Sequence, residues 1–182
     1  MKHICLTFIF LIAFISCSSP EPVEIPDANL AAAVREALNL DPNAPITDRN
    51  LKKLKSLSAK SRGITNLTGL EKATNLRHLN LSANQIVDIT PLARLPRLRT
   101  LGLAVNQISD VSPLTGLKQL QSLWLSKNEI SDISPIADLT KLIEMTLSDN
   151  QISDITPLIR LTIVTIRIKE TFFVFCDRMF LL

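Results

Sequence analysis

The chain has 182 residues, of which 46% are hydrophobic, with one Trp, no Tyr and only four Gly. This length suits one domain with a core of its own, and the abundance of aliphatic residues excludes a disordered or low-complexity chain. The formal net charge is +3. Acidic and basic residues are interleaved, so the charge makes no demand for nucleic acid or an anionic membrane as a partner.

Residues 1–16 are predicted to be a signal peptide. Lys2 precedes an apolar run from Ile4 to Ile15, which is too short to span a bilayer comfortably. The run ends in the sequence Phe14-Ile15-Ser16-Cys17. This ending resembles a bacterial lipobox, although Phe14 stands where Leu is usual. The resemblance implies that Cys17 is lipidated and becomes the mature N-terminus. The alternative is an ordinary cleaved signal peptide with an incidental cysteine.

Residues 17–25 are expected to form a lipidated tether, because Ser18 to Pro22 are polar and rich in proline. Residues 26–53 are predicted to form a helical N-terminal cap. Asp27 suits the N-cap position of its first helix, which Asp41-Pro42 ends. One face of this helix is expected to carry Leu30, Val34, Ala37 and Leu38. A second short helical element is expected near Thr47.

A 22-residue pattern occupies most of the rest of the chain. The strong copies are residues 76–97, 98–119, 120–141 and 142–163, and a degenerate copy covers 54–75. In the second strong copy the apolar positions are Leu98, Leu101, Leu103, Ile108, Val111, Leu114 and Leu117. One copy cannot bury so many aliphatic side chains alone, so successive coils must stack and share a core. The alternation in Leu101-Gly102-Leu103 is typical of a short strand, so stacked coils predict a parallel sheet.

These copies in strict register resemble the leucine-rich-repeat family, in its 22-residue bacterial class typified by internalins. The resemblance covers five repeats, residues 54–162. It implies an α/β repeat solenoid, a horseshoe segment with short parallel strands on the concave face and a helical N-terminal cap. It also implies a structural Asn ladder whose amides point inward and bond to the backbone: Asn84, Asn106, Asn128 and Asn150. Arg62 takes this place in the first copy, so we expect that coil to turn differently.

Each strong copy carries Ser or Thr before Pro. The pairs are Thr90-Pro91, Ser112-Pro113, Ser134-Pro135 and Thr156-Pro157. A hydroxyl at the N-cap with Pro at the next position would begin a helical turn. Because the segment after each pair is short, 3₁₀ or irregular turns are predicted on the convex face.

Residues 163–182 are predicted to be a degenerate or truncated C-terminal end. Ile163, Ile166 and Ile168 follow the strand pattern if one residue is deleted, and Thr171 then falls where Asn is due. The last twelve residues have no repeat signature. Three interpretations compete: an improvised cap over the last coil, pairing with another chain, and the end of a truncated or frameshifted longer protein, which we favour.

No catalytic site, metal or cofactor is expected, and the chain is not expected to be an enzyme. Once the leader is removed, His78 is the only histidine, so no catalytic triad or metal-ligand spacing can be completed. The aspartates that recur at one repeat position are Asp88, Asp110, Asp132 and Asp154. Stacked carboxylates could hold Ca²⁺, but a structural role is favoured. In that role the preceding Ser109, Ser131 and Ser153 share local hydrogen bonds with them.

Ligand binding is expected on the concave face, where alternate strand residues point outward. The candidate residues are His78, Thr100, Ser122 and Glu144 in one row, and Asn80, Gly102, Trp124 and Thr146 in the next. Ser56 and Ser58 begin the two rows, while Lys55, Arg77 and Arg99 make one end mildly basic. A face of five coils is only about 20 Å long, which is small for a standard protein interface.

Trp124 lies between Leu123 and Leu125, so its ring must face outward. Gly102, its row neighbour, leaves an empty place beside the ring. That place could be a shelf for a ligand side chain or sugar. Alternatively, the indole lies over Gly102 and covers its backbone.

We therefore expect a surface-anchored binding module that recognises a protein or glycan ligand through its concave face. It would lie in the bacterial cell envelope, at the cell surface or in the periplasm, with a lipid anchor at Cys17 and no nucleic-acid partner. The alternative is a structural or vestigial fragment of a longer repeat protein with no ligand of its own.

Overall fold

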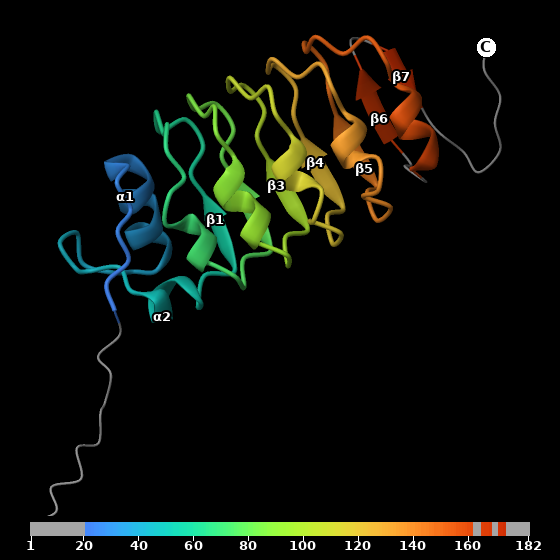
Figure 1. Cartoon of the computed structure of the whole chain (residues 1–182). Helices are drawn as coiled ribbons and strands as arrows, with labels where there is room; N and C mark the ends of the chain where they lie inside the picture. Colours follow the sequence, from blue (N-terminus) through green and yellow to red (C-terminus); the bar gives the residue numbers. More distant parts are fainter. Residues whose placement is uncertain (1–20, 162–164, 169–170, 174–182) are drawn as a thin grey trace, which may run out of the picture.

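A computed structural model describes residues 21–161, 165–168 and 171–173. The chain winds into a solenoid whose coils each contribute one short strand and one 3₁₀ turn (Figure 1). Two helices, α1 (Ala28–Ala37) and α2 (Asp48–Leu51), lie at the N-terminal end. The strands are β1 (Ser56–Ser58), β2 (His78–Asn80), β3 (Thr100–Gly102), β4 (Ser122–Trp124), β5 (Glu144–Thr146), β6 (Thr165–Ile168) and β7 (Thr171–Phe173). The 3₁₀ helices are η1 (Leu70–Lys72), η2 (Thr90–Arg94), η3 (Ser112–Leu114), η4 (Ser134–Ile136) and η5 (Thr156–Arg160).

The strands form one sheet in chain order, and β1 to β6 are parallel. Pairing advances by one repeat at each step as far as β5, as in Leu101↔Leu123. The next step pairs Met145 with Ile166, one residue short of a repeat, which confirms the predicted deletion. Thr171 occupies the position at which the repeat pattern predicts the next ladder asparagine, and it is the first residue of β7. This strand pairs antiparallel with β6 and so covers the backbone groups that β6 would otherwise expose.

The last nine residues lie outside the described part of the chain, and so does the predicted leader, residues 1–16. The three interpretations of the C-terminal end therefore stay predictions.

The core is a set of aliphatic columns that run the length of the solenoid. The column at the middle of the strands consists of Leu57, Leu79, Leu101, Leu123 and Met145, each at most 2% exposed. Because every coil places the same positions inside, neighbouring coils bury each other's apolar side chains, which no coil could do alone.

The Asn ladder fastens each coil to the one before it. Asn128 Nδ2 donates to the carbonyl of Leu125 in its own coil at 2.9 Å and to that of Leu103 in the preceding coil at 3.0 Å. Its Oδ1 accepts from the Ile108 amide, also in the preceding coil, at 3.1 Å. The same three kinds of bond recur at Asn84, Asn106 and Asn150. Each carboxamide is nearly satisfied in donors and acceptors, so its burial is tolerated.

The first coil turns differently at one position, as Arg62 in place of Asn predicts: Gly63 has a φ of 68°, whereas the equivalent residues of the later coils do not have a positive φ. Ser61 has a φ of 57°, close to the 58° of Ala83 at the same place in the next coil. The turn is held from outside, because Asn84 Oδ1 accepts from the Arg62 amide at 3.0 Å. The first coil follows the cap instead of another coil. The Arg62 guanidinium reaches Glu36 of α1 through two hydrogen bonds, of 3.0 and 2.6 Å.

The 3₁₀ turns lie where they were predicted, but they are not capped by the hydroxyls of the Ser/Thr-Pro pairs. In η2, Thr90 is the first helical residue, and the Asp88 carboxylate accepts from its backbone N–H at 2.8 Å. Asp110, Asp132 and Asp154 bond in the same way two residues ahead, and Asn66 does so in the first coil. Among the described residues, these bonds replace the expected sharing with the preceding serines.

The N-terminal cap is tied to the first coil by one carboxylate. Asp27 is the N-cap of α1, and its Oδ1 accepts from the amides of Asn29 and Leu30 at 3.0 Å. Its Oδ2 accepts from the Thr65 amide at 2.8 Å. Burial raises the pKa of Asp27, but these backbone bonds outweigh it and hold the pKa below its usual value.

The expected apolar face of α1 needs one correction. Leu30 and Val34 are buried, but Ala37 is exposed because the helix ends there. The second helical element begins where it was predicted, since Thr47 caps α2 by accepting from the Asn50 amide.

In the turn after each of the strands β1 to β5, a residue other than glycine adopts the left-handed conformation. Ser61, Ala83, Val105, Lys127 and Asp149 have φ between 56° and 59°. This conformation is costly for any side chain with a Cβ atom and worst for a β-branched one. Val105 therefore stores backbone strain, and it is also 47% exposed.

We predict that Asn128→Leu lowers the free energy of unfolding by about 3 kcal/mol, because the Leu103 and Leu125 carbonyls and the Ile108 amide lose their partner. Denaturant unfolding measures the change. The matched control is Gln107→Leu, whose exposed side chain should be replaceable within about 0.5 kcal/mol. Equal midpoints for the two variants would show that the ladder does not hold the coils together.

We predict that Val105→Gly raises the free energy of unfolding by about 1 kcal/mol, because glycine adopts this left-handed turn without strain. The control is Val87→Gly at a similarly exposed position, 56%, where φ is negative. That change should destabilise the chain by about 0.5 kcal/mol, because it only adds freedom to the unfolded state. Thermal unfolding of both variants tests the contrast, and a loss of stability in Val105→Gly contradicts it.

Candidate functional site

The concave face is built from the first and third residues of each strand. In the first row, His78 is exposed, while Thr100, Ser122 and Glu144 are half-buried. The His78 ring nitrogen Nδ1 lies 3.2 Å from the Thr100 hydroxyl, so these neighbours share a hydrogen bond. In the second row, Asn80, Trp124 and Thr146 are half-buried. The parallel register brings all of these residues side by side, as their positions in the repeat predict.

Gly102 differs from its expected role, because the place beside it is not empty. It is buried, and a Cβ atom built on it would lie 2.8 Å from the Asn80 Oδ1 and 3.0 Å from the Ser82 Oγ. The Asn80 carboxamide fills this place and accepts from the Ser82 amide at 3.0 Å. Asn80 crowds the glycine from the preceding coil, which argues against an empty shelf for a ligand, while the covering of Gly102 by the indole stays a prediction. Trp124 remains the one aromatic side chain in the two described rows.

The aspartate column serves the backbone. Hydrogen bonds from Thr90 hold the pKa of Asp88 below its usual value, and bonds from Ser134 and Thr156 do the same for Asp132 and Asp154. Asn66 makes the same turn without a charge, so the turn needs an acceptor and not a cation. Within residues 21–161, 165–168 and 171–173, no three acidic, His or Cys side chains come together as metal ligands would.

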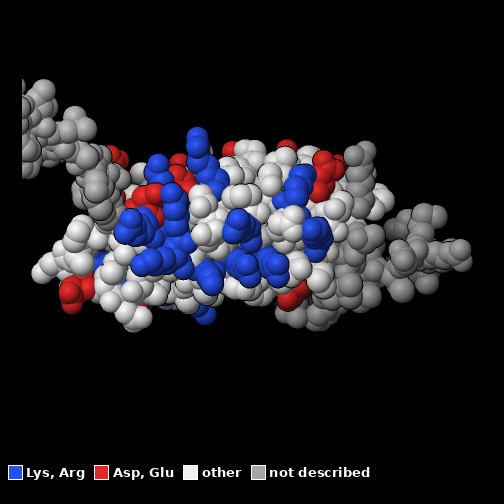
Figure 2. Space-filling model, turned by 90° about the horizontal axis from the view of Figure 1, so that it is seen from below, with Lys and Arg blue, Asp and Glu red and all other residues white. Residues whose placement is uncertain are grey.

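Basic side chains gather on one surface that extends beyond Lys55, Arg77 and Arg99, the three that the sequence predicts there. We call it the basic edge: the loops that lead into the strands, the last residues of η1 and η2, and α2 with the residues after it. Figure 2 shows Lys and Arg concentrated on the face seen from below. The residues of the basic edge are Arg49, Lys52, Lys53, Lys55, Lys72, Arg77, Arg94, Arg97, Arg99, Lys118 and Lys141. Acidic residues lie beside part of this surface, where Asp48, Glu71 and Asp88 line the same hollow as Lys52, Lys72 and Arg94. Repeat position reveals only one row of it, since Lys55, Arg77 and Arg99 are one repeat apart.

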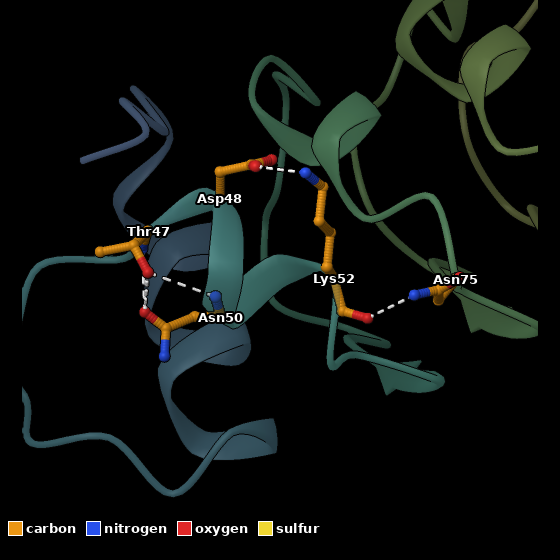
Figure 3. A network of polar contacts seen from close by, with 5 residues as sticks. All are labelled: Thr47, Asp48, Asn50, Lys52 and Asn75. Carbon is orange, nitrogen blue, oxygen red and sulfur yellow. Dashed lines mark hydrogen bonds and ion pairs between the residues drawn. The ribbon is translucent and has the colours of Figure 1, made fainter. Parts of the chain in front are cut away.

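Neutral groups hold several of these cations in place. Arg97 Nη1 donates to the Asn75 side chain at 2.7 Å, and Lys141 Nζ donates to the Gln119 side chain at 2.8 Å. Asn75 in turn donates to the Lys52 carbonyl at 2.7 Å (Figure 3). These amides fix the positions of the cations without neutralising their charge.

Ion pairing within the basic edge is sparse. In the described part of the chain, its one ion pair joins Lys52 Nζ to Asp48 Oδ2 at 2.6 Å (Figure 3). The other ion pair there, between Arg62 and Glu36, links the first coil to α1 and lies outside the edge. Arg77, Arg97 and Arg99 form no ion pair with any described residue.

No helix in the described segments combines the length and apolar character needed to cross a bilayer.

Comparison with known proteins places the repeats in a family. A family model described as leucine-rich repeats in two copies matches residues 52–94, 96–138 and 118–160. No curated protein matches the chain.

Solved structures of Listeria monocytogenes internalins are similar to the chain. An internalin (InlF) shares 28% identity with a TM-score of 0.67, over 85% of this chain and 55% of that one. Internalin C2 shares 31% identity over 84% of this chain and 98% of that one, with a TM-score of 0.38. The functional domain of InlJ, which includes a cysteine ladder, shares 24% identity with a TM-score of 0.62, over 79% of this chain and 38% of that one.

The chain thus spans about half the length of the InlF structure that it matches. The ladder that joins its coils is made of asparagine, and the matched ranges together cover the coils from β1 to η5. The chain belongs to the leucine-rich-repeat family and is internalin-like within it.

Proposed function

We propose that this chain is a lipid-anchored binding module of the bacterial cell envelope and that it recognises a protein ligand through its concave face. The anchor would be a lipid at Cys17, left after removal of residues 1–16, with residues 17–25 as the tether. Residues 26–53 would cap the core and 54–162 would carry the recognition surface. The single observation that carries this proposal is the half-buried Trp124 in the middle of the concave face.

The concave face has the character of a binding surface. Its described side chains are mostly small and polar, so a ligand can approach the sheet closely. Trp124 projects from the central strand β4 with Thr146 beside it in β5. Tryptophan is among the residues most enriched at binding hot spots, which makes Trp124 the natural anchor for a ligand on this face. The family supports the same assignment, because an internalin-like repeat solenoid is a scaffold for recognition and carries no conserved reaction chemistry.

Catalysis is a weaker assignment for this surface. His78 bonds to Thr100, and no carboxylate accepts from its ring among the described residues. A general base needs a nucleophile and an orienting partner within reach, and the two rows place neither beside His78. The same residues fit a hydrogen-bonding surface for a partner protein or glycan.

We predict that Trp124→Ala weakens ligand binding at least about tenfold and leaves the melting temperature nearly unchanged. The ligand would first be captured from extracellular host or bacterial surface proteins with the purified chain. Since Trp124 is the only tryptophan, its fluorescence reports directly on the concave face, and the captured ligand should shift its emission. The control is Val87→Ala, an exposed apolar side chain outside the two rows.

Two outcomes would contradict this assignment. Trp124→Ala could bind the ligand normally and melt earlier, in which case Trp124 is only part of the sheet. The emission of Trp124 could also stay unchanged while the ligand binds, which would place the site elsewhere.

We predict that Cys17 is the lipidated N-terminal residue of the mature protein. In a bacterial host, the intact mass should equal residues 17–182 plus acyl groups, and Cys17→Ser should release the protein from membranes or block its processing. The control is Cys5→Ser, which alters the leader and leaves the proposed anchor in place. A mature chain that begins elsewhere and carries no acyl chain overturns the anchor.

A further inference from the structure

We propose that the basic edge docks on the anionic headgroups of a lipid bilayer. This surface is distinct from the concave face, and its role goes beyond ligand recognition. The proposal depends on the proposed lipid anchor in one respect, because the anchor is what would bring the chain to the membrane. The electrostatic contact itself depends on residues that the structure describes.

The first support is uncompensated charge held at close spacing. Arg77 and Arg99 lie on adjacent coils, where the Arg99 amide donates to the Arg77 carbonyl at 2.8 Å. Neither forms an ion pair with any described residue. Like charges on neighbouring strands repel one another, and anions above the row would relieve that repulsion.

The second support is the shape and chemistry of the edge. Its cations spread over several coils and across more than one repeat position, so they form a broad patch (Figure 2). No aromatic side chain stands among them in the described chain. Proteins that bind single-stranded nucleic acid combine a basic groove with aromatic side chains that stack on bases. A broad basic patch without aromatics suits a laterally extended anionic surface better.

The third support is the place where the described chain begins. Glu21 and Pro22 run beside α2, since the Asp48 amide donates to the Glu21 carbonyl at 3.4 Å and Pro22 bridges to Thr47. Three residues lie between Cys17 and Glu21, so the two Cα atoms can be at most about 14 Å apart. A lipid on Cys17 would therefore keep Glu21, and α2 beside it, near the headgroups.

A basic patch beside a lipid anchor adds an electrostatic contact that would orient the chain on the bilayer. Anionic headgroups attract such a patch, and the attraction falls off within a Debye length. The geometry also keeps the concave face available. Lys55 and Arg77 directly precede β1 and β2, so an edge on the bilayer would point the strands away from the membrane. The concave face would then open to the side, where a ligand can reach Trp124.

The test measures binding of the full chain carrying Cys17→Ser, so that no acyl group contributes. The probes are vesicles of phosphatidylcholine alone and vesicles with one third phosphatidylglycerol. The zwitterionic vesicles report whatever the rest of the chain contributes, including its apolar leader. We expect clear preference for the anionic vesicles at low salt, and a steep loss of that preference as salt is raised.

Two double variants with the same change in net charge make the test specific. Arg77→Gln/Arg99→Gln removes charge from the basic edge, and Lys60→Gln/Lys127→Gln removes it from exposed sites past the other end of the strands. The first pair should weaken binding to anionic vesicles about tenfold, and the second should change it less than about twofold. Both should melt like the parent chain, because all four side chains are exposed.

Three results would overturn the proposal: equal binding to both kinds of vesicle, equal losses in the two double variants, or binding of soluble heparin or single-stranded DNA through the edge without binding to vesicles. Failure of the proposed anchor gives a different result. In that case the wild-type mature protein carries no acyl group, while the edge still selects anionic vesicles.

Discussion

A carboxamide buried in the wall of the solenoid fastens its coils to one another. Each ladder asparagine donates to a carbonyl of its own coil and to one of the coil before, and accepts from an amide of the latter. Aliphatic columns press the coils together without fixing their register, because apolar contact is not directional. The carboxamide fixes the register, because its hydrogen bonds form only when the backbone groups of both coils lie within bonding distance of it. The strands pair in constant register through β5 for the same reason.

At each end of the solenoid another residue replaces the ladder asparagine. Before the first coil there is no coil to fasten, and the ladder position is Arg62, which reaches Glu36 of α1 instead. Asp27 joins the same two elements through the amides of α1 and Thr65. At the other end, Thr171 stands in place of the asparagine and the chain reverses into β7. Coil stacking thus begins against a helical cap and gives way to an antiparallel strand.

The 22-residue period that places leucine in the core also arranges the surface residues in rows. A residue type that recurs at one repeat position becomes a row along the solenoid, one strand spacing apart. The concave rows and the basic edge are two such rows of surface, on adjoining sides of the strands. In the proposed lipid-anchored module, the concave rows would face the ligand and the basic edge would face the membrane. Neutral amides such as Asn75 and Gln119 position the cations of the edge and leave their charge for an outside partner.

The sequence by itself determined the solenoid, its strands, its 3₁₀ turns and its two capping helices, because each depends on a local pattern repeated in register. It also determined which residues share the concave face, since alternate strand residues must point away from the leucines. Only the tertiary structure decided how coils meet. It placed the Asn80 carboxamide against Gly102 and bound the Arg62 amide to the Asn84 side chain of the next coil. It also gathered charges that are interleaved along the chain onto one edge. The physical reason is that these contacts join residues about one repeat apart, whose distances in space depend on the stacking of coils and not on the pattern within a coil.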